Sequence, residues 1–299
     1  MSQNWSGIFP IVLTPFKESG EIDEDSLRRQ VEFCIKAGAR GLVGPANASE
    51  FATLSDNERR QWLKIVIDAA GEQVPVIASI TSGHELPAVE LGRFAEDAGA
   101  GGVMAMPPHI LHVDADGCYH YYQALAAALS IPICIQNFYG PLGTPMSAEL
   151  IARMCRELDG VDYIKEESPP EPQQISATLE AAGDVCKGVL GGQGAIYIMD
   201  EYRRGSVGNM PGSHTTDVLV ELWNRLDAGQ EQGARELFNG LLPLMNYERL
   251  YGIAIYKDVL HRRGIISSPH MRAPGPQLDA YDREELAKIL EGVEKLFII

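Results

Sequence analysis

The stretch Val161-Asp-Tyr-Ile-Lys-Glu-Glu-Ser168 lies between a turn signal and a pair of prolines that interrupts regular structure. It predicts one short strand over residues 161–167. Strand side chains alternate between the two faces of a sheet, so Lys165 and Glu167 share one face and Glu166 points to the other. The strand therefore presents a lysine, followed by a carboxylate, on one side of its carboxyl end.

Lys165 ends a mostly apolar segment, where a charged amine is costly to bury. Desolvation favours the neutral amine, which is nucleophilic and suited to forming a Schiff base with a carbonyl compound. The alternative is that Lys165 reaches water at the strand end and pairs with Glu166 or Glu167 as an ordinary surface lysine. This segment alone leaves both interpretations open.

The chain has 299 residues, of which 45% are hydrophobic, and a formal net charge of −16. This length suits one large α/β barrel or two ordinary domains. The acidic balance argues against a nucleic-acid partner, which would require clustered lysine and arginine. It does not define the substrate, because an acidic surface can still surround a local cationic site.

The five cysteines are scattered and show no metal-ligand spacing, which favours reduced thiols in a cytoplasmic protein. The amino-terminal segment lacks the basic and apolar regions of a signal peptide. No apolar run approaches the roughly 20 residues that a membrane-spanning helix needs. We therefore predict a cytoplasmic protein with no membrane partner.

Short apolar runs alternate with segments of helical periodicity along most of the chain, and Ser55 and Glu58 form a capping box ahead of one helix. Eight β–α units in about 225 residues predict an α/β protein with a (β/α)8 TIM barrel. An open doubly wound sheet would want a glycine-rich first turn, whereas this chain has Thr14-Pro-Phe-Lys17. The predicted strands cover residues 7–13, 41–44, 75–80, 102–106, 131–136, 161–167, 184–190 and 206–210.

Beyond residue 228 the strand signal disappears, and helical spacing returns near 230–246, 248–263 and 280–297. We therefore predict a barrel over residues 1–228 and a three-helix carboxyl-terminal extension over residues 229–299.

The active site of such a barrel lies at the carboxyl ends of the strands. Among the segments that this rule selects, only Lys165 is a cation on a strand end. The segments are Thr14-Pro15, Asn47–Glu50, Met106–His109, Gln136–Tyr139, Lys165–Glu167, Gly191-Gly192 and Asn209.

Several of these segments form an ordered set of motifs: Thr14-Pro15-Phe16, Ser49-Glu-Phe-Ala-Thr-Leu54, Met104-Ala-Met-Pro-Pro108, Tyr163-Ile-Lys-Glu166 and Gly191-Gly192. Over its whole length the chain resembles the dihydrodipicolinate synthase / N-acetylneuraminate lyase family of class I, pyruvate-type aldolases. The resemblance implies that Lys165 forms the Schiff base, without a metal or other cofactor. It also implies a small 2-keto acid substrate and a homotetramer or homodimer.

The chain departs from the usual family pattern at three positions. The loop after the second strand is Ala46-Asn-Ala-Ser-Glu50, Gln136 stands where a proton-relaying tyrosine is usual, and His109 follows the prolines of the fourth strand. A glutamine cannot act as an acid or base near neutral pH. These features resemble the branch of the family that dehydrates 2-keto-3-deoxy sugar acids such as L-2-keto-3-deoxyarabonate.

In that branch a glutamate two residues past the lysine is expected to do acid–base work, which implies Lys165 and Glu167 as the catalytic residues. Lys165 would condense with the substrate C2 carbonyl, a C3 proton would be removed, and the C4 hydroxyl would leave as water to give 2-oxoglutarate semialdehyde. The predicted substrate-binding residues are Asn47, Ala48, Ser49, His109, Gln136, Asn137, Tyr139, Gly191 and Gly192.

Two other functions stay open, namely an aldolase or synthase with Tyr139 as proton relay and a non-catalytic protein that binds sugar acids. A metal-dependent hydrolase is disfavoured, because no His/Asp cluster follows the strands.

Each site residue also has a structural alternative. Glu167 could be a rim carboxylate, Asn47 and Ser49 could shape a turn, and Glu50 could be a buried structural acid. His109 could be an ordinary loop residue, and Gly191-Gly192 could form a turn, bind phosphate or let the backbone approach the substrate.

Overall fold

The computed structural model describes residues 4–140, 143–273, 275 and 278–299. It divides into two compact units. The first unit holds the described residues of 1–6 and 75–210, and the second holds those of 7–74 and 211–299.

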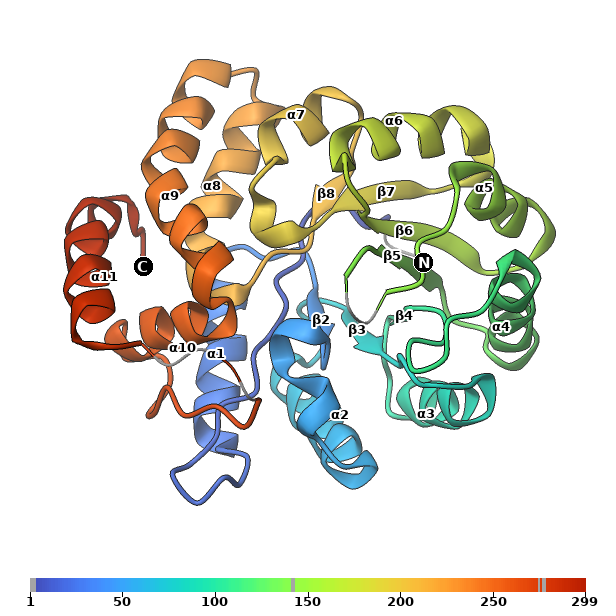
Figure 1. Cartoon of the computed structure of the whole chain (residues 1–299), viewed down its shortest axis with the longest axis horizontal. Coiled ribbons are helices and arrows are strands. Elements are labelled where there is room, and N and C mark those ends of the chain that lie inside the picture. The colour runs from blue at the N-terminus through green and yellow to red at the C-terminus, as the bar shows by residue number, and fades with distance from the viewer. Residues whose placement is uncertain (1–3, 141–142, 274, 276–277) are drawn as a thin grey trace. The chain divides into compact units, whose positions relative to one another are not determined.

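In the described part of the first unit, six parallel strands pair in the order β3-β4-β5-β6-β7-β8. Each strand is followed along the chain by helical segments, and α3 to α6 lie along the outer side of these strands (Figure 1). The elements are β3 (Val76–Ser79), α3 (Glu85–Asp97), β4 (Gly102–Ala105), α4 (Ala115–Ala128), β5 (Ile133–Phe138), α5 (Ala148–Glu157), β6 (Val161–Glu167), α6 (Glu171–Ala182), β7 (Gly188–Gly191), α7 (Ile198–Arg203) and β8 (Gly208–Asn209).

The second unit holds the remaining two strands and the carboxyl-terminal helices. Ile11 forms parallel bridges with both Val43 and Gly212. Helix α9 packs against α8, α10 and α11 (Figure 1). The elements are β1 (Gly7–Ile8), α1 (Glu24–Lys36), β2 (Leu42–Gly44), α2 (Asp56–Ala70), α8 (Thr216–Asp227), α9 (Glu231–Tyr251), α10 (Ile253–Arg262) and α11 (Ala280–Val293).

Short 3-10 turns connect several of these elements. They are η1 (Asn47–Ser49), η2 (Phe51–Thr53), η3 (Gly183–Val185), η4 (Gln193–Ala195), η5 (Ser213–Thr215) and η6 (Glu294–Leu296).

The sixth predicted strand is confirmed over its full length, as is the capping box of Ser55 and Glu58 at α2. The first predicted strand is regular only over Gly7–Ile8, because Pro10 has no N–H to donate. The fifth strand extends to Phe138, beyond the predicted end at Gln136.

Near β7 the predicted boundaries are wrong. Residues 183–185 form a 3-10 turn in which Val185 is 42% exposed, so the strand begins only at Gly188. The helix that follows β7, α7, begins only at Ile198, because Gly194 and Ala195 have φ angles of 68° and 66° in the left-handed region. The eighth strand is likewise shorter than predicted, covering only Gly208–Asn209.

Among the described residues beyond 228, three α-helices follow, as predicted, although the first of them continues to Tyr251. Gly252, with a φ of 54°, separates it from α10. All five cysteines are free thiols. Within the described part of the chain, no helix is long and apolar enough to cross a membrane.

Candidate active site

Lys165 and Glu167 lie side by side at the carboxyl end of β6. Lys165 Nζ is 3.2 Å from Glu167 Oε2, and each residue is about 5% exposed. The prediction that they share a face is therefore confirmed, and the alternative of a solvated surface lysine is wrong. On the same face of β6, two residues before Lys165, the ring of Tyr163 stacks on the ring of Trp5, with ring centroids 4.2 Å apart. The amine therefore sits in a poorly hydrated position next to a carboxylate.

Both oxygens of the Glu167 carboxylate receive hydrogen bonds. Gln136 Nε2 donates to Oε2 at 2.8 Å, and the backbone N–H of Gln193 donates to Oε1 at 3.1 Å. Gln136 lies opposite Lys165 in the pairing of β5 with β6, which explains why its amide points to the same side. The glutamine that replaces the usual tyrosine thus orients Glu167. Sequence reasoning missed Gln193.

Gly191 and Gly192 make room for two glutamates. A Cβ at Gly192 would lie 2.4 Å from Cγ of Glu167, and a Cβ at Gly191 would lie 2.1 Å from Oε2 of Glu201. Distances this short exclude any side chain at either position without displacement of the acid. The structure therefore gives these glycines a packing role that the sequence alternatives did not include.

We expect Gly192→Ala to push the Glu167 carboxylate away from Lys165. A displacement of about 1 Å at a catalytic group costs on the order of 10²-fold in rate, so kcat/KM should fall by about that factor. Steady-state kinetics would measure the effect. Gly292→Ala is the matched control, because a Cβ at exposed Gly292 meets open space. Unchanged kinetics in Gly192→Ala would show that the position of Glu167 does not limit the reaction.

Asn137 and Glu166 lie on the opposite face of the strands from Lys165. Asn137 Nδ2 donates to Glu166 at 2.9 Å, and Asn137 Oδ1 accepts from the backbone N–H of Met146 at 2.8 Å. The N–H of Ser168 donates to Glu166 at 2.8 Å. Burial raises the pKa of Glu166 to about 7. The structure therefore does not bring Asn137 together with Lys165, and the Asn137 amide is hydrogen-bonded within the protein.

The structure does not place Tyr139 in the buried surroundings of Lys165. Tyr139 follows the end of β5, its side chain is 62% exposed, and its backbone N–H donates to the Glu167 carbonyl at 3.4 Å. His109 is half-buried in the loop after β4.

In the second unit, Asn47, Ala48 and Ser49 form η1, a single 3-10 turn after β2. Ser49 Oγ donates to the carbonyl of Val12 at 2.6 Å and accepts from the N–H of Ala46 at 3.0 Å. The hydroxyl of Ser49 is therefore used to hold the turn, in agreement with its structural alternative. Asn47 Oδ1 is buried, and within the described residues no hydrogen-bond donor reaches it.

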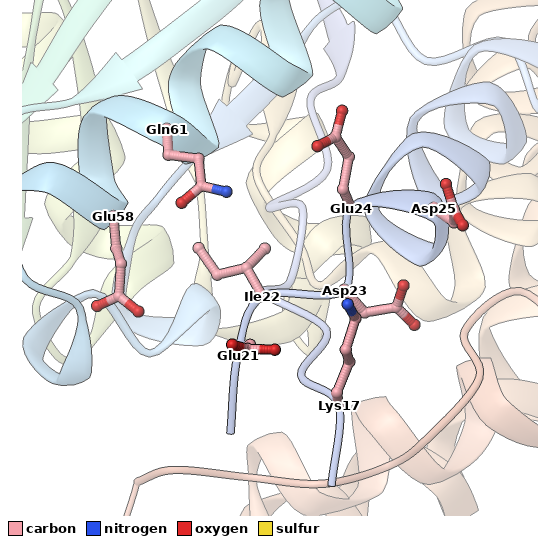
Figure 2. A pocket seen from close by; sticks show the side chains of 8 residues that line it. All are labelled: Lys17, Glu21, Ile22, Asp23, Glu24, Asp25, Glu58 and Gln61. Carbon is pink, nitrogen blue, oxygen red and sulfur yellow. The ribbon is translucent and has the colours of Figure 1, made fainter. Parts of the chain in front are cut away.

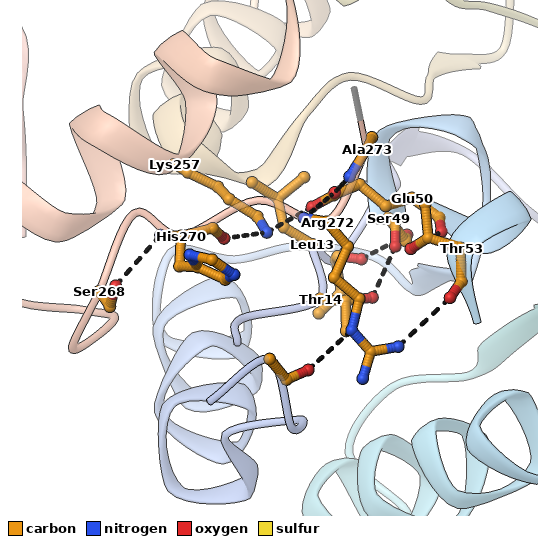
Figure 3. A network of polar contacts seen from close by, with 12 residues as sticks. Leu13, Thr14, Ser49, Glu50, Thr53, Lys257, Ser268, His270, Arg272 and Ala273 are labelled. Atoms are coloured by element: carbon orange, nitrogen blue, oxygen red, sulfur yellow. Dashed lines mark hydrogen bonds and ion pairs between the residues drawn. The ribbon is translucent and has the colours of Figure 1, made fainter. Parts of the chain in front are cut away.

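Glu50 is a buried structural acid at the centre of a polar network in the second unit (Figure 3). It is 3% exposed, adopts a left-handed conformation with a φ of 58°, and pairs with the fully buried Lys257 of α10. Its other oxygen accepts from the backbone N–H groups of Arg272 and Ala273, at 2.9 and 2.6 Å. Lys257 Nζ also donates to the His270 carbonyl at 2.8 Å.

The same network contains a partly buried ion pair, which joins Arg272 to Glu58 at 2.6 Å. The hydrogen bond from Arg272 lowers the pKa of Glu58 to about 2. The Arg272 guanidinium and the Lys257 amine each lie 4.4 Å from the Phe16 ring centroid. Together these contacts fix the segment around Arg272 to the turn that contains Ser49 and Glu50. Sequence reasoning missed Lys257 and Arg272.

A separate pocket of about 460 Å³ lies in the second unit (Figure 2). Its lining is mostly acidic and includes none of the predicted site residues. The lining residues are Lys17, Glu21, Ile22, Asp23, Glu24, Asp25, Glu58 and Gln61. Within the described residues, no group of His, Cys, Asp or Glu side chains is placed to hold a metal ion.

Comparison with known proteins gives consistent results at full length. The family model described as "Dihydrodipicolinate synthetase family" matches residues 4–293. An L-2-keto-3-deoxyarabonate dehydratase from Azospirillum brasilense is 33% identical over 98% of this chain and 96% of its own. A 4-hydroxy-tetrahydrodipicolinate synthase from Methanothrix thermoacetophila is 32% identical over 97% of both chains.

Solved structures show the same likeness. The dihydrodipicolinate synthase of Rhodopseudomonas palustris has a TM-score of 0.90 at 28% identity and covers 98% of this chain and 99% of its own. The pyruvate complex of the synthase from Acinetobacter baumannii also has a TM-score of 0.90, at 25% identity, with coverage of 98% and 99%. These likenesses confirm the predicted (β/α)8 barrel with carboxyl-terminal helices. The chain belongs to the dihydrodipicolinate synthetase family, whose enzymes use a lysine Schiff base without a cofactor.

Proposed function

We propose that this protein is a Schiff-base-forming hydro-lyase that dehydrates a 2-keto-3-deoxy sugar acid, with L-2-keto-3-deoxyarabonate as the substrate. The observation that carries the proposal is the arrangement of Glu167 between the Lys165 amine, at 3.2 Å, and the Gln136 amide, at 2.8 Å. The likeness to the Azospirillum brasilense dehydratase supports the choice of substrate.

The reaction begins when the Lys165 amine attacks the C2 carbonyl and water is lost, which leaves a protonated imine. The neighbouring Glu167 carboxylate serves as the base that removes a proton from C3, so that the electrons pass into an enamine. The nitrogen lone pair of the enamine then re-forms the C2=N bond, the electrons of the C2=C3 bond move between C3 and C4, and the C4 hydroxyl takes up a proton and leaves as water. A double bond remains between C3 and C4.

Tautomerisation then moves this double bond between C4 and C5, where it becomes the enol of a C5 aldehyde. Hydrolysis of the imine releases 2-oxoglutarate semialdehyde and restores the free lysine. The sequence of steps consumes one water to hydrolyse the imine and releases two, which gives a net loss of one water from the substrate.

Aldol cleavage places a different demand on the site, because a base must take the proton of the C4 hydroxyl. The amide of Gln136 has no proton-accepting capacity near neutral pH. Its hydrogen bond instead fixes the carboxylate of Glu167. Tyr139, a residue that is 62% exposed, is a poor replacement for a buried relay. These features favour dehydration over cleavage.

A product assay tests the proposal. Purified protein is incubated with a panel of 2-keto-3-deoxy acids, and 2-oxoglutarate semialdehyde and pyruvate are quantified separately. We expect the semialdehyde from L-2-keto-3-deoxyarabonate and no pyruvate. Pyruvate as the product would establish the aldolase alternative, and the absence of any borohydride-stable adduct would favour the non-catalytic sugar-acid-binding protein.

Glu167→Gln separates imine formation from proton removal. A carboxamide cannot accept the C3 proton, so kcat should fall by about 10² to 10⁴, the usual range for a general base. Borohydride trapping of pyruvate should still label Lys165, because the amine remains. Equal loss of turnover and of trapping would instead assign Glu167 to activation of the lysine.

We further propose, from the sequence, that the protein is a cytoplasmic homotetramer or homodimer and that its barrel ends near residue 228. The binding of the substrate carboxylate by the turn of Asn47, Ala48 and Ser49 stays a prediction, as does a substrate contact for His109.

A further inference from the structure

Glu201 is a buried acid on α7 to which the proposed reaction gives no role. Its residue exposure is 1%, and Oε2 accepts a hydrogen bond from Asn209 Nδ2 at 2.7 Å. The other oxygen, Oε1, and the Oδ1 atom of Asn209 are buried, and within the described residues neither has a hydrogen-bond partner. A lone ionised carboxylate in such a position would be strongly destabilising.

This acid lies against the turn that holds Glu167. Gly191 pairs with Glu166 on one side and with Asn209 on the other, so it belongs to the face opposite Lys165. Oε2 of Glu201 occupies the space where a Cβ of Gly191 would be. The next residue along the chain, Gly192, is contacted in the same way by Glu167. Two acids therefore contact consecutive glycines from opposite faces.

The turn between these contacts has an unfavourable backbone conformation. Gln193 and Ala195 have φ angles of 48° and 66°, which non-glycine residues rarely adopt. Such conformations persist only where the surrounding structure enforces them. The N–H of Gln193 is the group that donates to Glu167 Oε1, so the conformation of this turn determines where that carboxylate is held.

Acidic groups surround Glu201. Glu171 of α6, Glu167 of β6 and Asp200 of its own helix are the charged groups that act on it. Burial first, and then these charges, raise the pKa of Glu201 to about 8. The side chain is therefore neutral at pH 7, which allows it to remain in an acidic and buried environment.

We propose that Glu201 is a positioning residue that works as a neutral acid, holding the turn of Gly191 to Gln193 so that the Gln193 N–H fixes the catalytic carboxylate of Glu167. The proposal rests on the proposed function, because it takes Glu167 as the base. Ionisation of Glu201 would place a second negative charge, in addition to that of Glu167, against the turn of Gly191 to Gln193 and would disturb this turn.

The test is the exchange of pyruvate methyl protons for deuterium, followed by NMR between pH 6 and 10. This exchange requires the imine at Lys165 and a base, but no sugar acid. Wild-type exchange should fall above about pH 8, and Glu201→Gln, which has the shape of the neutral acid, should keep its rate at pH 7 and lose this alkaline fall. Glu201→Ala should lose about tenfold or more at every pH, because the turn loses its support.

Glu180→Gln is the matched control, since Glu180 is an exposed glutamate on α6, and it should follow the wild type. Borohydride trapping on Lys165 should succeed in every variant. If trapping succeeds and Glu201→Gln shows the wild-type alkaline fall, or loses tenfold at pH 7, the positioning proposal is overturned while the proposed function stands.

If the wild type neither traps pyruvate nor exchanges its protons, the proposed function fails, and thermal unfolding still tests the state of Glu201. Its pKa is raised in the folded protein, so the unfolded chain releases this proton first. The free energy of unfolding should therefore decrease from about pH 4.5 to about pH 8. Glu201→Gln should reduce this decrease and leave the part that comes from Glu166, whose pKa is raised to about 7. A pH dependence that the substitution leaves unchanged would overturn the proposal that Glu201 is a neutral acid.

Discussion

Lys165→Ala is expected to abolish both the dehydration of 2-keto-3-deoxy acids and the borohydride-stable adduct with pyruvate. Loss of a covalent nucleophile commonly lowers kcat by at least about four orders of magnitude. In this chain Lys165 is 5% exposed, and its amine lies 3.2 Å from the Glu167 carboxylate, where alanine supplies no nucleophile. Product formation and mass analysis of the reduced adduct would measure the two effects.

Lys187→Ala is the matched control for this experiment. Lys187 precedes β7, and its half-exposed side chain pairs with Asp162 at 2.7 Å, away from the carboxyl end of the strands. The control variant should retain activity and adduct. An adduct that persists in Lys165→Ala, or that maps to another lysine, would contradict the assignment of the nucleophile.

The second large effect concerns stability. Lys257→Met should lower the free energy of unfolding by about 3–5 kcal/mol, because the Glu50 carboxylate would be left buried without its cation. Chemical denaturation at pH 7 would measure the loss. Lys288→Met is the matched control, and it should cost no more than about 1 kcal/mol because the ion pair of Lys288 with Glu284 is exposed.

The double variant Lys257→Met/Glu50→Gln should recover a large part of this loss. Burial lowers the pKa of Lys257 to about 8 in spite of the neighbouring Glu50. The desolvation of the amine therefore outweighs its attraction to the carboxylate, and the expected loss in the single variant comes from the isolated Glu50. A double variant as unstable as Lys257→Met would show that the ion pair itself is strongly stabilising.

The order of strands and helices could be predicted from apolar patterns, because the strands are short runs that are buried throughout, whereas each helix buries one face. The alternation within β6 also placed Lys165 with Glu167 and separated both from Glu166, as the structure confirms. The same alternation, applied to β5, would have placed the side chains of Gln136 and Asn137 on opposite faces of the sheet. The predicted strand ended at Gln136, one residue too early for this distinction to be drawn.

Other features depend on contacts between residues far apart in the chain. No local pattern indicates that Lys257 reaches Glu50, or that Glu201 occupies the space beside Gly191. The left-handed conformations of Gln193 and Ala195 are equally hidden, since neither residue type favours them. Sequence reasoning identified the two glycines as special and could not say which neighbours required them.

The contacts at Gly191 and Gly192 restrict how this enzyme can diverge. At each glycine, a glutamate side chain occupies the space where a Cβ would lie. A larger residue in place of the glycine is therefore tolerated only if the glutamate is replaced by a smaller residue or changes its position. Natural variants that keep the reaction should therefore show correlated exchange at positions 191 and 201, and should retain Gly192 together with the catalytic Glu167. Redesign of the reaction by relocating the carboxylate would have to change both members of a pair at once.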